Sequence, residues 1–252
     1  MRGSIAMSST NVLLWSVLPY IAISSFVIGL IWRFKYDKFN WTTRSSQIYE
    51  GKLLSIAGPL FHLGLFAVIG GHVVGLLVPQ EFTDSLGLSH QMYHLGAISM
   101  GGAAGIATLL GISLLIYRRR TTAMVFAQTT KNDKTMYIFL MATLLAGSAA
   151  TLSSAGVIGE EHNYRETVGP WVRSILTLSP NGELMMASPI AFRVHAIVAM
   201  SLFIIWPFTR LVHSLSAPVG YLFRPSIVYR TRDGRGVAGS RKARQGWERV
   251  KY

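Results

Sequence analysis

The sequence contains no cysteine among its 252 residues. This absence excludes disulfide bonds, iron–sulfur clusters held by thiolates, zinc sites with cysteine ligands, and haem attached covalently through a CxxCH motif. A metal site in this chain must therefore use histidine, methionine or carboxylate ligands, or hold its cofactor without a covalent bond.

Charged residues are also scarce, at 14% of the chain, whereas 50% of the residues are hydrophobic. A bilayer core of about 30 Å needs roughly 20 apolar residues in a helix. Runs of that length lie at about 11–32, 53–78, 94–117, 135–158 and 189–213. They predict an all-α integral membrane protein with a bundle of five transmembrane helices. Residues 1–214 would form this transmembrane domain, and residues 215–252 a basic tail.

Acidic residues are few, 11 against 24 lysines and arginines, and the two signs are unevenly placed. Lysine and arginine cluster after the first run, after the third run and in the tail, whereas the segment from 79 to 93 has none. Before the fifth run, Arg165 and Arg173 stand among several acids. By the positive-inside rule the N-terminus lies outside and the C-terminus in the cytoplasm. The net charge of +13 then needs no nucleic acid, and we expect the tail to contact membrane lipid or partner subunits.

Four histidines lie within two of the apolar runs: His62 and His72 in the second, His195 and His213 in the fifth. An ionisable side chain in a membrane helix is usually retained for a function. His195 and His213 are eighteen residues apart, which is five helical turns and about 27 Å, so they would share one face. His62 and His72 are ten residues apart, about 15 Å. The two helices run antiparallel, which predicts that His62 pairs with His213 and His72 with His195.

Two facing imidazoles without a carboxylate nearby suit a six-coordinate haem iron. Small residues would let a flat macrocycle approach the helices, namely Gly64, Gly70, Gly71, Gly75, Gly101, Gly102 and Gly105. Arg210 near the inner pair and Arg193 near the outer pair are candidate partners for haem propionates, and Pro207 should loosen the fifth helix between the two sites.

The sequence SHQMYHLG places His90, Tyr93 and His94 at the outer end of the third run. A neutral imidazole there would accept a proton from a lipid-soluble quinol, so these three residues are candidates for a quinol site. His162, in EEHNYRE, is expected in a solvated loop.

The blocks SSFVIGLIWRF, FHLGLFAVIGGHVVG, MGGAAG and FRVHAIVAMSLFIIWPFTRLVHSLSAPVGYL resemble those of the gamma subunit of respiratory nitrate reductase, a dihaem cytochrome b subunit. The resemblance implies two non-covalent b haems, the inner at His62 and His213 and the outer at His72 and His195. It also implies a multi-pass protein of the prokaryotic cytoplasmic membrane that oxidises menaquinol or ubiquinol at the outer face. Electrons would pass to an iron–sulfur beta subunit and then to a molybdenum-containing alpha subunit, where nitrate is reduced.

Two alternatives remain at this point. A dihaem b subunit of another quinone-linked complex, such as a heterodisulfide or sulfite-type reductase, would have similar ligands and a different soluble partner. A haem-free transporter would use the histidines as proton or metal sites. Transporters usually have internal repeats or paired broken helices near the membrane midplane, and the sequence indicates neither.

Overall fold

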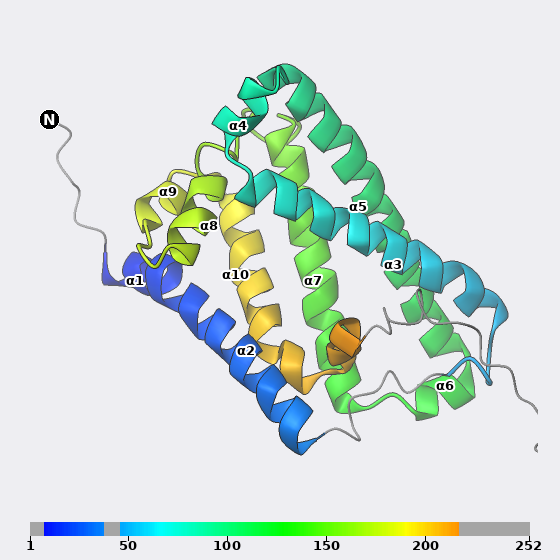
Figure 1. Ribbon diagram of the computed structural model, residues 1–252. Coiled ribbons are helices and arrows are strands. Elements are labelled where there is room, and N and C mark those ends of the chain that lie inside the picture. Colours follow the sequence, from blue (N-terminus) through cyan, green and yellow to red (C-terminus); the bar gives the residue numbers. More distant parts are fainter. Residues whose placement is uncertain (1–7, 38–45, 217–252) are drawn as a thin grey trace, which may run out of the picture. The chain divides into compact units, whose positions relative to one another are not determined.

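The computed structural model describes residues 8–37 and 46–216. Within those ranges the chain is helical and contains no strand. Five of the helical segments there are long and apolar enough to cross a membrane: Ser9–Tyr36, Lys52–Leu77, His90–Thr121, Lys131–Ser154 and Ile190–Phe208 (Figure 1). The predicted all-α membrane fold with five spanning helices is therefore confirmed. From residue 217 onward, the predicted tail lies outside the residues that the structure describes.

The first span consists of α1 (Ser9–Val12), the π-helix η1 (Leu13–Val17) and α2 (Leu18–Tyr36). Proline at position 19 has no N–H to donate to the preceding turn, and a wider turn accommodates it: the N–H of Leu18 bonds to the carbonyl of Leu13. Farther along, the Ser25 hydroxyl donates to the carbonyl of Ile204 at 3.0 Å. This bond ties α2 to the fifth span.

The second span, α3 (Lys52–His72) followed by the π-helix η3 (Val73–Leu77), packs closely against α5 (His90–Thr121). Glycine makes this approach possible on both helices. A Cβ atom at Gly64 would lie 2.6 Å from Thr108 Oγ1, and one at Gly111 would clash with the backbone of Phe61. Small residues at a helix crossing are the usual device of membrane bundles. Gly64 therefore serves helix packing rather than the approach of a macrocycle.

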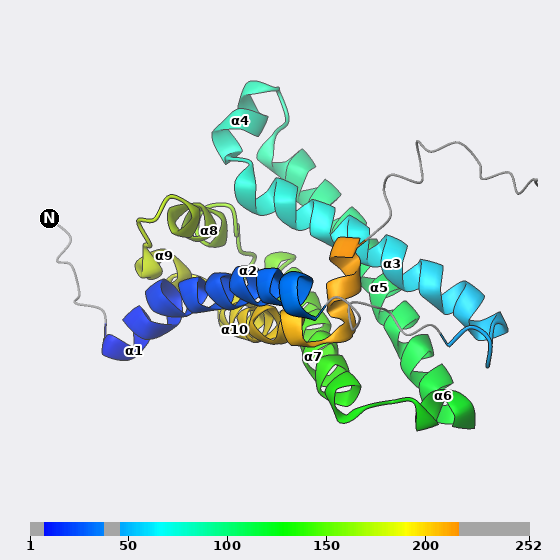
Figure 2. The ribbon, with the colours of Figure 1, turned by 60° about the horizontal axis from the view of Figure 1, so that its bottom comes forward.

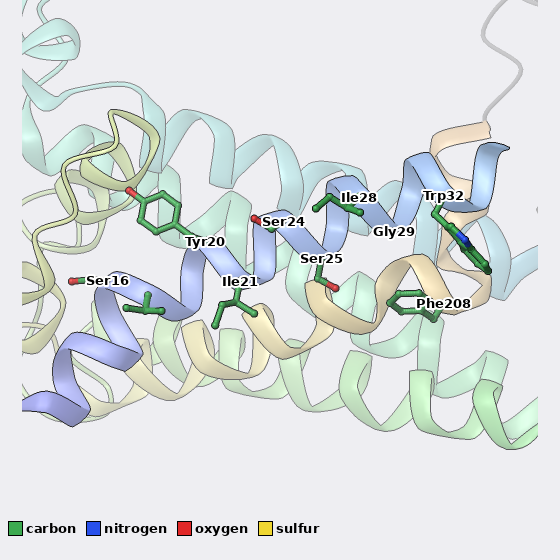
Figure 3. A pocket seen from close by; sticks show the side chains of 10 residues that line it. Ser16, Tyr20, Ile21, Ser24, Ser25, Ile28, Gly29, Trp32 and Phe208 are labelled. Atoms are coloured by element: carbon green, nitrogen blue, oxygen red, sulfur yellow. The ribbon is translucent and has the colours of Figure 1, made fainter. Parts of the chain in front are cut away.

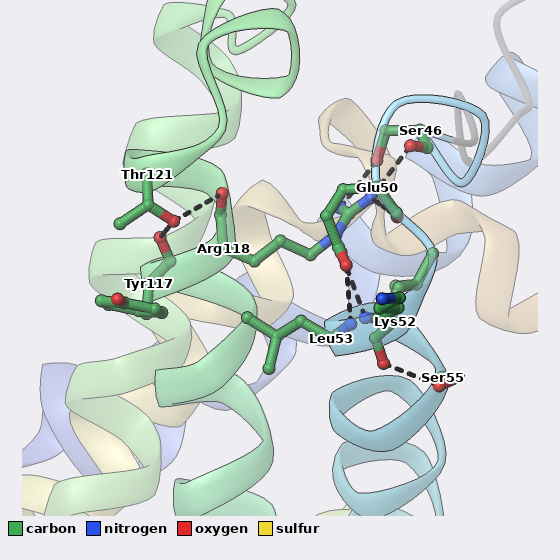
Figure 4. A network of polar contacts seen from close by, with 9 residues as sticks. Ser46, Glu50, Lys52, Leu53, Ser55, Tyr117, Arg118 and Thr121 are labelled. Carbon is green, nitrogen blue, oxygen red and sulfur yellow. Dashed lines mark hydrogen bonds and ion pairs between the residues drawn. The ribbon is translucent and has the colours of Figure 1, made fainter.

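An ion pair between the buried Arg118 and the partly exposed Glu50 fixes the beginning of α3 to the end of α5 (Figure 4). The Arg118 guanidinium is 3% exposed and donates to the carboxylate of Glu50 and to the hydroxyl and carbonyl of Ser46. Glu50 also accepts a hydrogen bond of 2.7 Å from the N–H of Leu53 in the first turn of α3. The Leu53 N–H and the Arg118 guanidinium lower the pKa of the Glu50 carboxyl. The ionised carboxylate thus caps the helix that carries His62 and His72.

The fourth span, α7 (Lys131–Ser154), packs against α10 (Ile190–Ile205), and both contribute to a shared apolar core. A capping box begins α7: the Thr130 hydroxyl accepts from the Asp133 N–H, and the Asp133 carboxylate accepts from the Thr130 N–H. One buried cluster joins this pair to α3 and α5 and comprises Phe61, Ile112, Met136, Leu140, Leu202 and Leu211.

The fifth span is not one continuous helix, and the prediction of a single helix over 189–213 is wrong. After α10 the chain forms two 3-10 helices, η4 (Trp206–Phe208) and η5 (Arg210–Ser216), separated by Thr209 in an extended conformation. Pro207 removes a backbone donor and so ends the α-helical hydrogen bonding, and the Thr209 hydroxyl bonds to the carbonyl of Trp206. Figures 1 and 2 show η5 turned out of the line of α10. The assumption that His195 and His213 share one helical face therefore fails.

Short helices mark the two ends of the bundle (Figure 1). At one end, which we call the α8 end, lie α4 (Gln80–Ser85), α8 (Val168–Leu176) and α9 (Gly182–Met186). Here η3 ends and α10 begins. At the opposite end, the α6 end, α6 (Ala123–Ala127) connects α5 to α7.

Candidate functional site

The structure brings the four membrane histidines together in two pairs. The ring centroids of His62 and His213 are 6.2 Å apart, and those of His72 and His195 are 6.0 Å apart. Each pair joins α3 to the fifth span, once to η5 and once to α10. Beyond Thr209, η5 does not continue the axis of α10, so the separation of His195 and His213 is not that of two residues on one straight helix.

All four imidazoles have the same ring nitrogen next to a backbone carbonyl. Nδ1 of His62 and of His72 lies 2.8 Å from the carbonyl oxygen four residues earlier in α3. Nδ1 of His195 lies 3.1 Å from the carbonyl of Thr143 on α7, and Nδ1 of His213 contacts the carbonyl of Arg210. A carbonyl can only accept, so Nδ1 carries the proton in the neutral ring and the lone pair is on Nε2. This tautomer leaves Nε2 free to bind a metal ion, while the carbonyl partner of Nδ1 fixes the ring.

The spacing of the paired rings fits one metal ion between them. A metal–nitrogen bond is about 2 Å and a ring nitrogen lies roughly 1 Å from the ring centre, so two imidazoles on opposite sides of one ion have centroids about 6 Å apart. Among the described residues, no group of three or more His, Cys, Asp or Glu is placed to hold a metal ion. Each pair therefore offers two imidazole nitrogens, the donors that a bis-histidine haem would use.

Glycines near these pairs differ in what they contact. A Cβ atom at Gly70, Gly71, Gly101, Gly102 or Gly105 would meet nothing within 4 Å. A Cβ atom at Gly75 would lie 2.8 Å from the hydroxyl of Tyr164, and one at Gly147 of α7 would lie 3.0 Å from Cε1 of His195. Open space therefore borders α3 and α5 at these glycines. Gly75 and Gly147, in contrast, leave room for the rings of Tyr164 and His195, respectively.

The two arginines predicted near the pairs differ in their surroundings. Arg210 Nε lies 3.2 Å from the buried Asp133 carboxylate at the start of α7, without the angle of a hydrogen bond. Arg210 also lines a cavity of about 270 Å³ together with Ser46, Arg119 and Gln128. Nε of Arg193 is buried and has no hydrogen-bond partner within the described part of the chain.

The three predicted quinol-site residues separate into two groups at the α8 end. The rings of His90 and His94 stack with centroids 5.9 Å apart, and His94 Nε2 lies 3.2 Å from a carboxylate oxygen of Glu161. Tyr93 points to other partners: its hydroxyl lies 3.3 Å from that of Tyr164, and the Arg165 guanidinium lies 3.9 Å from its ring centroid.

His162 lies in the loop before α8, as the sequence predicted, but its side chain is partly buried rather than fully solvated. Its ring packs on Phe192 with centroids 5.5 Å apart, and its Nε2 lies 2.8 Å from the Thr167 hydroxyl. Burial lowers the pKa of His162, and the nearby Glu166 carboxylate opposes that shift.

Sequence reasoning gave no role to several residues that the structure places at these sites, namely Thr143, Gly147, Glu161 and Tyr164, and it used Arg165 only as a charge. Most of them belong to α7 or to the segment before α8 and contact residues far away in the chain. One signal was available: Arg165 and Arg173 are basic residues on the side that the charge pattern predicts to be outside. Both donate to carbonyls at the end of the second span, Arg165 to Pro79 and Arg173 to Leu76.

Another groove lies elsewhere, along the first span. It encloses about 680 Å³ between Ser16 and Trp32 on one side and Phe208 on the other, and its lining is almost entirely apolar (Figure 3). None of the histidines or arginines discussed above lines it.

Comparison with known proteins gives consistent matches along most of the chain. The family model described as nitrate reductase gamma subunit matches residues 11–232. The nitrate reductase gamma chain of Bacillus subtilis is 42% identical over 220 residues, which are 87% of this chain and 98% of the relative. The respiratory nitrate reductase 2 gamma chain of Escherichia coli is 34% identical over 224 residues, 88% of this chain and 97% of the relative. A nitrate reductase-like protein NarX of Mycobacterium tuberculosis is 52% identical over 235 residues, 93% of this chain, and the match spans 36% of the length of that relative.

Proposed function

Because the chain belongs to the nitrate reductase gamma subunit family, the membrane subunit of respiratory nitrate reductase, we propose that it is the quinol-oxidising electron-transfer subunit of such a complex. The observation that carries this proposal is the set of two histidine pairs, each with rings about 6 Å apart. Family membership favours this reading over a heterodisulfide or sulfite-type reductase subunit and over a haem-free transporter.

Each histidine pair would hold one non-covalent b haem, His62 with His213 and His72 with His195. A haem bound in this way supplies a carrier for one electron. The protein residues contribute the neutral Nε2 ligands and, through the carbonyl partners of Nδ1, the orientation of each ring. Arg210 and Arg193 would face propionates at the inner and outer sites, respectively. The buried Nε of Arg193, which has no hydrogen-bond partner among the described residues, supports its assignment. Arg210 would bind a propionate at the cavity that it lines together with Arg119.

The α8 end would face the outside of the cytoplasmic membrane of a prokaryote. Lysine and arginine concentrate at the α6 end and in the tail, as the positive-inside rule requires for the cytoplasmic side. Arg165 and Arg173 at the α8 end are consistent with this orientation, because each donates to a carbonyl in the region where the second span ends. The inner pair, His62 and His213, would then lie nearest the iron–sulfur beta subunit, which passes electrons to the molybdenum-containing alpha subunit.

Quinol oxidation at the α8 end would release protons outside while electrons move inward. A quinol gives up two electrons and two protons, and the protons need acceptors that open to solvent. His94 is 14% exposed in its side chain and contacts Glu161, which is 63% exposed, so this pair forms a route from a half-buried imidazole to solvent. Each electron that crosses a potential of 100 mV, negative inside, moves about 2.3 kcal/mol uphill, so the reaction charges the membrane.

The test uses the complete complex in membranes. We expect a quinol to drive nitrate reduction in the wild type, and we expect a reduced viologen dye, which donates to the soluble subunits, to drive it as well. His72→Ala should abolish quinol-driven nitrate reduction and spare the dye-driven reaction. Equal loss of both activities, or retention of both, would contradict the proposed electron route.

A further inference from the structure

Arg165 carries a charge that the fold leaves only partly compensated. Its side chain is 3% exposed, and Nη2 donates to the Thr83 hydroxyl at 2.8 Å and to the Pro79 carbonyl at 3.2 Å. Its Nε and Nη1 are buried and have no hydrogen-bond partner, and no ion pair within the described ranges includes this residue. A buried charge without a counterion is costly and therefore needs a specific reason.

The Arg165 guanidinium is placed against the ring of Tyr93, 3.9 Å from the centroid. A cation over an aromatic face is attracted to the ring and limits its movement. Tyr93 and Tyr164 have their hydroxyls 3.3 Å apart, so the two groups can orient each other.

Tyr164 connects this hydroxyl pair to both elements that carry the outer histidines. Its ring stacks on Phe192 with centroids 6.3 Å apart, and Phe192 precedes His195 by three residues on α10. Its hydroxyl lies over Gly75, which follows His72 by three residues in η3, with 2.8 Å to the position of an added Cβ. Three residues are about one helical turn. The Tyr93–Tyr164 pair is therefore held next to the turn of helix adjoining each member of the His72–His195 pair.

The other predicted quinol-site residues lie in a different setting. His94 contacts the exposed Glu161 and stacks on His90, and among the described residues neither ring forms a hydrogen bond, ion pair or ring contact with η3 or α10. Of the three predicted residues, Tyr93 is the one linked to the outer histidine pair.

We propose, on the basis of the function proposed above, that the hydroxyls of Tyr93 and Tyr164 bind a ring oxygen of the quinol beside the outer histidine pair and that Arg165 is the positioning residue that holds the Tyr93 ring in place. This assigns the arginine of the segment before α8 a role in substrate binding. It also separates the binding hydroxyls from the His94–Glu161 route by which protons leave.

The first experiment measures steady-state kinetics of the complete complex with a reduced short-chain naphthoquinone. Arg165→Gln should raise KM at least tenfold, retain two haems and leave the dye-driven reaction unchanged. Arg165→Lys keeps a cation within reach of the ring and should recover part of the loss. The matched control is Arg173→Gln, which removes the other arginine bonded to the end of the second span. An Arg165→Gln variant within twofold of wild type, an equal effect of Arg173→Gln, or loss of a haem in both Arg165 variants would overturn the assignment.

A double-mutant cycle tests whether Arg165 acts through Tyr93. Tyr93→Phe removes only the hydroxyl and should raise KM to a similar extent as Arg165→Gln. Because the two residues form one unit, the double variant should be no worse than the more severe single variant. Additive effects would assign Arg165 a separate structural role and overturn the proposal. A wild-type complex that contains two haems and oxidises no quinol would overturn the proposed function together with this inference, whereas a fully active Arg165→Gln complex would overturn the inference alone.

Discussion

The imidazole rings of His72 on α3 and His195 on α10 have centroids 6.0 Å apart, and Nδ1 of each lies within hydrogen-bond distance of a backbone carbonyl, that of Val68 and that of Thr143. The two rings come from antiparallel helices far apart in the sequence. Two neutral imidazoles in this arrangement can bind one metal ion from opposite sides.

We expect His72→Ala and His195→Ala to have the same consequence, because either change would remove one of the two imidazoles that would hold this haem. Each variant should contain one b haem per chain instead of two and should lose quinol oxidation. Haem is measured by pyridine haemochrome against protein concentration. Two haems in either variant would exclude this pair as a haem site.

His62→Ala and His213→Ala should remove the other haem and interrupt electron flow to the soluble subunits. Quinol should then still reduce the haem that remains at His72 and His195, while quinol-driven nitrate reduction stops. Rapid-mixing spectroscopy at the b-haem α band follows the reduction. The pairing would be wrong if His62→Ala and His213→Ala removed different haems.

Substitution of Gly147 tests how closely the His195 ring packs against α7. Gly147→Ala places a methyl group 3.0 Å from Cε1 of His195, tighter than ordinary packing, so the ring must shift by a few tenths of an ångström. We expect a changed midpoint potential for the outer haem alone, measured by redox titration. Gly96→Ala, where a Cβ would meet nothing within 4 Å, is the control and should leave both potentials unchanged. A shift of the inner potential would contradict the assignment of His195.

The Glu50–Arg118 pair predicts a dependence of stability on pH. The pKa of Glu50 is lowered in the folded protein, so its contribution is fully present above the unfolded value of about 4.3 and is lost as the pH falls through the lowered pKa. Glu50→Gln should reduce the melting temperature in detergent by a few degrees at pH 7 and should have less effect below pH 4. An undiminished difference at low pH would show that the charge of Glu50 is not what stabilises the beginning of α3.

The number of spans, their approximate limits and the proximity of the histidine pairs could be predicted from the sequence. Apolar length and histidine depth are local properties of the helices, and depth alone brings His62 near His213 and His72 near His195. The position of His213 on a separate 3-10 helix could not be predicted from spacing, because periodicity alone does not tell whether Pro207 kinks a helix or ends it. Their role as haem ligands stays a prediction.

The surroundings of Tyr93 could not be predicted for a different reason. Tyr164 and Arg165 belong to the segment between the fourth span and α8. Their contacts with Tyr93 therefore depend on how the loops pack at the α8 end. The only sign of these contacts in the sequence was the presence of Arg165 and Arg173 on the side with few basic residues. The structure explains that exception by the carbonyls of Leu76 and Pro79, to which Arg173 and Arg165 donate.

The most direct test of the central claim is the haem content of the wild-type protein, measured as a dithionite-reduced minus oxidised spectrum with pyridine haemochrome quantitation. We predict two non-covalent b haems per chain, one for each histidine pair. A preparation shown to be folded and to contain no haem would contradict the electron-transfer function and leave the histidines as proton or metal sites of another kind.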